Sequence, residues 1–141
     1  MSNYIYTWVD FDSDLDVIKK NIRKEYDTVV GISKGGLPLA VKVANILKLP
    51  LKVVEARSYT NRGRGNLVVE QFNPIPWGPR VLLVDDICDS GNTLFSITET
   101  LKVWKKKVET LTLIKRENSK FKPTYRLHEL PKGIWVEFPW E

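Results

Sequence analysis

Two adjacent carboxylates, those of Asp85 and Asp86, stand directly after the apolar residues 81–84. Such an apolar run is typical of a strand buried on both faces of a parallel sheet, which would leave both aspartates in the polar loop that follows. Residues 89–93 supply turn chemistry, hydroxyls and backbone amides where a helix over 93–106 is expected to begin. Because a helix start attracts phosphate, the segment predicts a sugar phosphate site whose aspartates hold sugar hydroxyls or a magnesium ion. The alternative is an ordinary N-capped helix of an α/β domain.

A second loop with suitable chemistry, Ser33-Lys34-Gly35-Gly36, follows a predicted strand over 28–32. Its glycines allow a ligand to approach the backbone closely, the amides before the next helix point outward, and the lysine adds a full charge. These features predict a cradle for pyrophosphate, although an ordinary strand-to-helix turn can have the same residue types. Ligands in open α/β sheets bind beyond the carboxyl ends of the strands, and three loops here leave such ends, so we expect these loops to converge.

Strand-like and helix-like segments alternate along the 141 residues, which predicts one α/β domain with a mostly parallel, twisted sheet flanked by helices. The expected helices span 14–24, with Ser13 as N-cap, 37–47 and 93–106, and the expected strands span 28–32, 51–56, 81–84 and 108–114. The core of the domain would occupy about 10–114.

Two segments break this alternation. Residues 57–80 are rich in glycine, arginine and proline, and we expect a long mobile loop over about 57–72, with plain disorder as the alternative. Residues 115–141 contain three prolines and few helix signals. They predict an irregular cap, called the hood below, over one end of the sheet.

Composition and charge limit the classes of function. The net charge of +5 fits an anionic ligand and would also fit weak nucleic-acid binding. The basic residues 102 and 105–107 fall at the end of a predicted helix and complement its dipole, so we expect no nucleic-acid role. One cysteine and one histidine cannot build a Cys/His metal cluster, which leaves oxygen ligands and points to magnesium. The apolar stretches are far shorter than the roughly 20 residues of a membrane helix, so we expect a cytoplasmic protein without a membrane span.

The order of an apolar run, two acids, two further residues and Asp-Ser-Gly-x-Thr resembles the 5-phosphoribosyl-1-pyrophosphate (PRPP) signature of type I phosphoribosyltransferases. The resemblance implies that Asp85 and Asp86 hold the ribose hydroxyls. It also implies that Asp89 takes a proton from the acceptor base, with a purely structural Asx-turn as the alternative. The 5′-phosphate would be bound by Asp89, Ser90, Gly91, Asn92 and Thr93.

Two further segments match this family. The resemblance assigns the pyrophosphate to the loop of Ser33, Lys34, Gly35 and Gly36, and it implies a cis peptide bond between Ser33 and Lys34. Ser58 and Tyr59 match a pair in the flexible loop that closes over PRPP in the family. Arg62 or Arg64 would then neutralise the departing pyrophosphate while the closed loop excludes water.

The hood is similar to that of bacterial xanthine-guanine phosphoribosyltransferases, in the 6-oxopurine branch of the family. The similar residues are Lys115 and the final Trp-Val-Glu-Phe-Pro-Trp-Glu. The resemblance implies that Lys115 donates to the purine 6-oxygen, that Trp135 stacks on the ring, and that the backbone of Val136 accepts from the base edge. It also implies magnesium pyrophosphate or base-edge binding at Glu141, where the family has aspartate. Packing within the hood is the alternative for Trp135 and is the expected role of Trp140.

The resemblance as a whole implies a magnesium-dependent salvage enzyme that converts PRPP and guanine, xanthine or hypoxanthine into a nucleoside monophosphate and pyrophosphate. It further implies a homodimer or homotetramer. One alternative is a regulatory protein of the same fold that senses PRPP or nucleotides or binds RNA. Another is a pyrimidine or orotate phosphoribosyltransferase, against which the aromatic segment around Trp135 argues.

Overall fold

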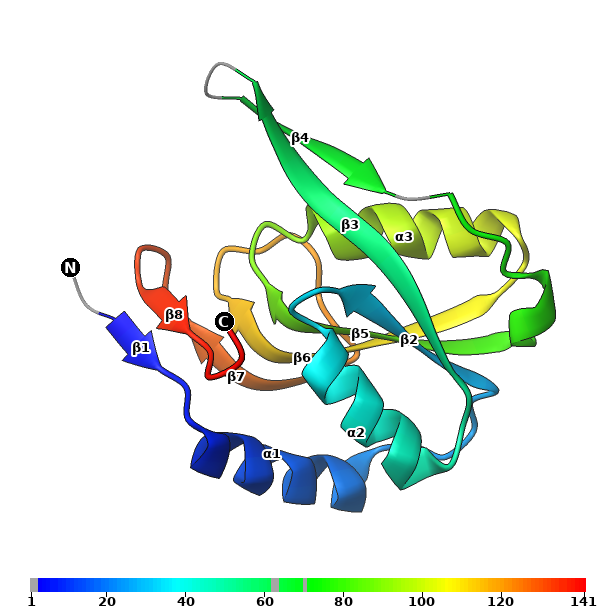
Figure 1. The fold of residues 1–141 in the computed structure, drawn as a ribbon, viewed down its shortest axis with the longest axis horizontal. Helices are drawn as coiled ribbons and strands as arrows, with labels where there is room; N and C mark the ends of the chain where they lie inside the picture. The colour runs from blue at the N-terminus through cyan, green and yellow to red at the C-terminus, as the bar shows by residue number, and fades with distance from the viewer. Residues whose placement is uncertain (1–2, 62–63, 70) are drawn as a thin grey trace.

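The computed structural model describes residues 3–61, 64–69 and 71–141, which form a three-layer α/β fold with a small hood (Figure 1). Its elements are β1 (Asn3–Ile5), α1 (Trp8–Asn21), β2 (Thr28–Ser33), α2 (Leu37–Leu47), β3 (Leu51–Asn61), β4 (Arg64–Val69), a 3-10 turn (Ile75–Trp77), β5 (Arg80–Cys88), α3 (Asn92–Val103), β6 (Lys107–Arg116), β7 (Tyr125–Leu130) and β8 (Trp135–Glu137). No helix in the described ranges is long and apolar enough to cross a membrane.

The main sheet has six strands in the order β4-β3-β2-β5-β6-β7. All neighbours are parallel except β3 and β4, which confirms the predicted mostly parallel sheet. A separate pair, β1 and β8, is also parallel and lies beside the carboxyl ends of the central strands, with β8 contributed by the hood (Figure 1). Strands β2, β5 and β6 are neighbours, so the loops that leave their carboxyl ends open at the same edge of the sheet.

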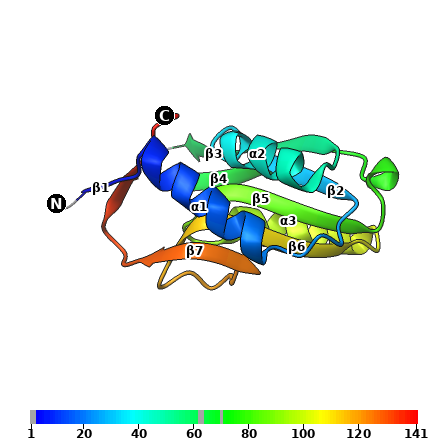
Figure 2. The same cartoon turned by 90° about the horizontal axis from the view of Figure 1, so that it is seen from below.

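The two faces of the sheet carry separate cores. Helices α1 and α2 cover one face and α3 covers the other (Figure 2). Strand β5 contributes to both, because Leu82 and Val84 pack with the first two helices whereas Val81 and Leu83 pack with α3. All four are 0% exposed. The prediction of a strand buried on both faces over 81–84 is therefore confirmed. A central strand has helices on both sides of the sheet, so its side chains must be apolar on both faces.

The boundaries of two helices differ from the sequence predictions. Helix α1 begins at Trp8, six residues before the expected start at 14, because Thr7 and Asp10 form a reciprocal capping box. Ser13, the expected N-cap, lies inside this helix. Helix α3 spans Asn92–Val103 and does not reach 106, because the chain turns at Lys105, whose φ of 61° is left-handed.

The two segments expected to be irregular both contain strands. Strand β3 continues to Asn61 and pairs with β4 in an antiparallel hairpin, so most of the expected loop over 57–72 is extended chain that projects from the sheet (Figure 1). Its mobility stays a prediction. The prediction of an irregular hood over 115–141 was wrong for two segments: Tyr125–Leu130 adds a fifth parallel strand next to β6, and Trp135–Glu137 pairs with β1. A strand at the sheet edge needs only one buried face, so it lacks the apolar run that marks β5.

Candidate active site

The aspartate pair lies within β5 and not in the loop after it, because this strand continues to Cys88. The backbone N–H of Asp86 donates to Oδ1 of Asp85 at 2.8 Å, and the N–H of Ile87 donates to Oδ1 of Asp86 at 2.8 Å. Burial raises the pKa of both carboxyl groups, and the neighbouring Asp86 charge raises the pKa of Asp85 further. A ligand that brings hydroxyl donors or a cation would stabilise the ionised form of these two half-buried acids.

The glycine loop after β2 packs directly against this pair. A Cβ atom on Gly35 would lie 2.4 Å from Oδ2 of Asp86, and one on Gly36 would lie 2.8 Å from the carbonyl oxygen of Val84. The predicted cis peptide bond between Ser33 and Lys34 is present. Helix α2 then begins at Leu37 without a side-chain cap. The glycine loop therefore meets the aspartate pair at the carboxyl end of β5, and only glycine leaves room for this approach.

The loop from Asp89 to Thr93 makes the turn from β5 into α3. Gly91 has a φ of 92°, and a Cβ atom there would lie 2.5 Å from Cβ of Phe121. Oγ of Ser90 accepts from the N–H of Asn92 at 3.2 Å. A cavity of about 80 Å³ in this loop is lined by Asp85, Ile87, Cys88, Asp89, Ser90, Gly91, Thr93 and Leu94. Its size, its polar loop and the adjacent helix start suit a single phosphate group.

A larger cavity of about 460 Å³ lies between this loop and the hood. It is lined by Asn3, Asp89, Arg116, Lys132, Gly133, Ile134 and Trp135. Asp89 lines both cavities, and among the described residues it is the only one that the two linings share. Trp135 is 62% exposed, so a face of its indole ring is accessible to a flat ligand. The arrangement places an aromatic surface and a carboxylate next to a phosphate-sized cavity.

The other two residues predicted to bind the purine, Lys115 and Val136, do not line the larger cavity. Lys115 is 5% exposed near the end of β6, and its Nζ donates to the carbonyl oxygen of Arg116 at 2.9 Å. The side chain of Val136 is buried in the core, so only its backbone is suited to a ligand. Arg116, and not Lys115, lines the cavity beside Asp89.

The end of the chain forms a packed turn. Oε1 of Glu141 accepts from the N–H of Phe138 at 3.1 Å, so this carboxylate has a structural partner. Trp140 stacks on Phe138 with ring centroids 4.9 Å apart and also packs against Phe11. Trp140 thus has the packing role expected from the sequence, and magnesium binding at Glu141 stays a prediction.

The residues predicted to close over the ligand are only partly described. Ser58 and Tyr59 belong to β3 and Arg64 to β4, and only their backbone is described. Arg62 lies outside the described residues. Their roles at the pyrophosphate stay predictions.

Several residues that line the larger cavity were not predicted from the sequence, and Arg116 is the one that contacts the predicted proton acceptor. Its Nε donates to Oδ1 of Asp89 at 3.3 Å, from a side chain that is almost fully buried. The contact depends on the register of β5 and β6, which places Cys88 opposite Lys115, and the sequence carries no local signal for that register. One feature of the sequence does point to Arg116: it directly follows Lys115 at the carboxyl end of a predicted core strand, where ligands of α/β sheets bind.

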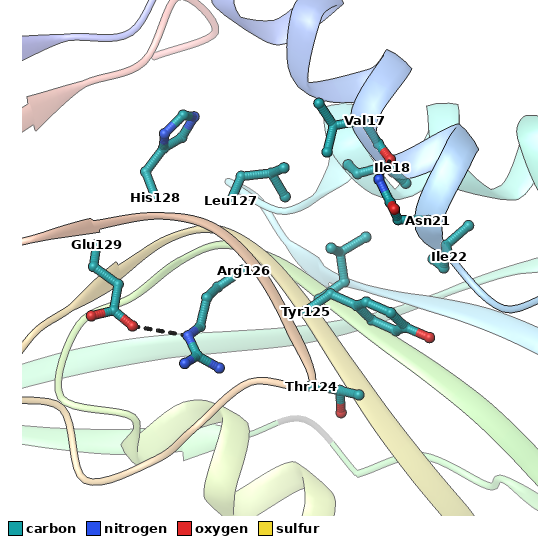
Figure 3. A pocket seen from close by; sticks show the side chains of 11 residues that line it. Val17, Ile18, Asn21, Ile22, Thr124, Tyr125, Arg126, Leu127, His128 and Glu129 are labelled. Atoms are coloured by element: carbon teal, nitrogen blue, oxygen red, sulfur yellow. Dashed lines mark hydrogen bonds and ion pairs between the residues drawn. The ribbon is translucent and has the colours of Figure 1, made fainter.

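A cavity of about 400 Å³ between α1 and β7 lies apart from these loops (Figure 3). Its polar groups already have partners, since Arg126 pairs with Glu129 at 2.9 Å and His128 contacts Asp14 at 2.9 Å. The residues that line it include none of those predicted for the site. The cavity therefore adds no chemistry to the candidate active site.

Comparison with known proteins agrees with this geometry. The family model described as phosphoribosyl transferase domain matches residues 15–141. Xanthine-guanine phosphoribosyltransferase of Chromohalobacter salexigens is 27% identical over 124 residues, which are 85% of this chain and 72% of that protein. Hypoxanthine/guanine phosphoribosyltransferase of Methanocella arvoryzae is 29% identical over 115 residues, 73% of this chain and 59% of that protein.

Solved structures show the same architecture. Helicobacter pylori xanthine-guanine-hypoxanthine phosphoribosyltransferase superposes with a TM-score of 0.87 at 25% identity, covering 99% of this chain and 94% of that one. Purine phosphoribosyltransferase from Pyrococcus horikoshii superposes with a TM-score of 0.83 at 28% identity, covering 100% and 95%. With a matching fold and a family model that extends over most of its length, the chain belongs to the phosphoribosyltransferase family.

Proposed function

We propose that the chain is a purine salvage phosphoribosyltransferase. It transfers the 5-phosphoribosyl group from PRPP to guanine, xanthine or hypoxanthine and releases the nucleoside monophosphate and pyrophosphate. The observation that carries the proposal is the position of Asp89, which lines both the phosphate-sized cavity and the larger cavity beside Trp135. A sugar phosphate in the first cavity and a base in the second would meet at this carboxylate. The names of the similar purine enzymes support the choice of a purine as acceptor.

In the proposed complex the loop at 89–93 binds the 5′-phosphate and the glycine loop after Ser33 binds the pyrophosphate. Asp85 and Asp86 accept hydrogen bonds from the ribose hydroxyls. As the bond to pyrophosphate breaks, positive charge develops on the sugar, and the two nearby carboxylates stabilise it. Asp89 accepts the proton that the purine ring nitrogen loses when it bonds to the anomeric carbon, so charge and protons balance.

Magnesium is part of this proposal, and the residues fit it as an ion shared with the substrate. Magnesium prefers oxygen ligands and is usually bound through one or two carboxylates together with substrate phosphates. Over the described ranges no three acidic, histidine or cysteine side chains gather into one metal-binding group. Asp85 and Asp86 would therefore hold the ion jointly with oxygens of PRPP. When bound, magnesium neutralises charge on the pyrophosphate as it departs.

Pyrophosphate release tests the proposal. The chain is incubated with PRPP and magnesium and with guanine, xanthine or hypoxanthine in separate reactions, while orotate serves as a pyrimidine control. We expect release with at least one 6-oxopurine, none with orotate, and loss of release when EDTA removes magnesium. Tight binding of PRPP or a nucleotide without release for any base would instead favour a regulatory protein of the same fold. Sedimentation of the same sample tests the proposed homodimer or homotetramer.

A further inference from the structure

Arg116 is a buried cation that takes no part in the reaction proposed above. It is 8% exposed at the end of β6, although arginine side chains are almost never fully buried unless they are paired. Burying a guanidinium costs free energy that its partners must offset. The identity of those partners therefore indicates what the residue does.

The guanidinium joins two sides of the larger cavity. Its Nε donates to Oδ1 of Asp89 at 3.3 Å, in the phosphate loop. Its Nη1 donates to the carbonyl oxygen of Pro131 at 3.2 Å, in the turn that leads to Trp135. Asp89 itself is exposed, with a side-chain exposure of 76% against 10% for Arg116. A rigid, buried donor thus fixes an otherwise exposed carboxylate and the hood backbone at once.

The backbone of Arg116 fixes a further group. Its carbonyl oxygen accepts from Nζ of Lys115 at 2.9 Å and from the N–H of Ser119 at 3.1 Å. Oγ of Ser119 in turn lies within hydrogen-bond distance of the carbonyl oxygens of Ser90, at 3.3 Å, and Phe121, at 3.2 Å, and its one proton is shared between them. One residue therefore contacts the proposed proton acceptor, the lysine predicted for the purine, the hood and the segment that supports the phosphate loop.

We propose that Arg116 is a positioning residue for the transfer step, an inference that rests on the proposed function. By engaging Oδ1 of Asp89, it orients the carboxylate so that Oδ2 faces the purine ring nitrogen. By engaging the carbonyl oxygen of Pro131, it keeps the wall that carries Trp135 at a fixed distance from Asp89. Misplacement of a reacting group by about 1 Å can lower a rate by about a hundredfold, so such positioning has a measurable effect.

The chain offers a matched control in Arg126 on β7. Its Nε donates to Oε1 of Glu129, three residues along the same strand, at 2.9 Å (Figure 3). Its Nη1 donates to the carbonyl oxygen of Pro123 at 3.3 Å, so this arginine also joins a carboxylate to a proline carbonyl. Arg126 lines the cavity between α1 and β7 and lies outside the proposed site. Arg126 is the more exposed of the two, 38% against 10% for the side chains, so it controls for the loss of an arginine–carboxylate pair, and the melting temperature separates structural damage in Arg116→Gln from a loss of positioning.

The test measures kcat, KM for PRPP, KM for the purine and melting temperature in wild type, Arg116→Gln, Arg116→Lys and Arg126→Gln. We expect Arg116→Gln to lower kcat by about 10- to 100-fold and to raise KM for the purine, with KM for PRPP changed by less than about threefold. Arg116→Lys keeps the charge but not the planar fork, so it should recover only part of kcat. Arg126→Gln should leave all three kinetic constants near wild type.

A double-mutant cycle of Arg116 and Asp89 tests whether Arg116 acts through Asp89. If Arg116 acts through Asp89, then Arg116→Gln lowers kcat by less than about threefold when Asp89→Asn is already present. An equal loss of kcat with and without Asp89→Asn, or a loss in Arg126→Gln as large as that in Arg116→Gln, overturns the inference. In both cases the proposed function stands, because wild type is active. A wild type that releases no pyrophosphate with any purine overturns the proposed function and the inference together.

Discussion

Asp89 is the residue at which the two cavities of the site meet, and it is the proposed proton acceptor. We expect Asp89→Asn to lower kcat by about a hundredfold or more, because an amide has no lone pair basic enough to take the proton. The dissociation constant for PRPP should change little, since the loop amides and hydroxyls remain. Steady-state kinetics and calorimetric titration measure the two quantities. Asp16→Asn, on the exposed side of α1, is the control, and near-normal turnover in Asp89→Asn would remove the proton-acceptor role.

Asp85 combines a functional role with a cost to stability. Folding raises its pKa, chiefly through burial and secondly through the charge of Asp86, so the folded chain binds this proton more tightly than the unfolded chain does. The free energy of unfolding therefore falls as the pH rises from the unfolded pKa near 3.9 through the raised folded value.

Asp85→Asn should remove this cost while it abolishes transfer. Asparagine keeps an Oδ1 acceptor for the N–H of Asp86 but cannot ionise. We expect the free energy of unfolding to rise by about 0.5 to 2 kcal/mol at pH 8 and to gain little at pH 4. Urea unfolding at the two pH values measures the difference. A variant less stable than wild type at pH 8 would show that the acid pair supports the fold.

Trp135 offers its exposed ring to the larger cavity. If the ring stacks on the purine, Trp135→Leu should weaken binding of the base by about 1 to 3 kcal/mol and leave PRPP affinity unchanged. Trp104→Leu is the matched control, because Trp104 is 43% exposed at the end of α3. Equilibrium titration of each variant with nucleoside monophosphate and with PRPP gives both affinities. Equal weakening of the two ligands would indicate a packing role in the hood.

At the scale of elements, the start of α1 depends on the capping box of Thr7 and Asp10. Thr7→Ala should lower the free energy of unfolding by about 1 kcal/mol, because it removes the side-chain acceptor for a helix amide. Ser13→Ala, within the same helix, should be neutral or slightly stabilising, because alanine has the higher helix propensity. Thermal or urea unfolding compares the two. The opposite order would place the functional N-cap at Ser13.

The central elements could be predicted because their signals are local. The apolar run before Asp85 marks a buried strand, and α2 begins and ends at the predicted residues 37 and 47. The three-residue spacing of Thr7 and Asp10 also matches a capping box, so the true start of α1 has a local signal in the sequence. Strand β7 was not predicted, because an edge strand between prolines has neither an apolar run nor a clear period.

The site could be predicted as a set of loops but not as a set of contacts. The order of the strands in the sheet brings the loops after Ser33 and Cys88 together, and parallel α/β folds share this property. The contact between Arg116 and Asp89 joins residues 27 positions apart across two strands. Such a pair depends on register, which is a property of the folded sheet and has no sequence period of its own.

For the whole molecule, the hood and the sheet jointly make the proposed site. The hood packs through aromatic rings against α1 and the segment before it: Tyr6, before the helix, contacts Phe138 at 5.3 Å, and Phe11 of α1 contacts Trp140 at 5.2 Å between ring centroids. Asn3 pairs in register with Trp135, so the first strand of the chain supports the wall that faces Asp89. The two ends of the chain therefore complete a cavity whose chemistry comes from the middle of the sheet.

The most direct test of this account is the stoichiometry of products from PRPP and a 6-oxopurine. We expect chromatography to show one nucleoside monophosphate for each pyrophosphate released, and no release when the base is left out. This result would place sugar, pyrophosphate and base in one site around Asp89. Pyrophosphate release that does not depend on the base, or binding of PRPP without any nucleoside monophosphate from guanine, xanthine or hypoxanthine, would contradict it.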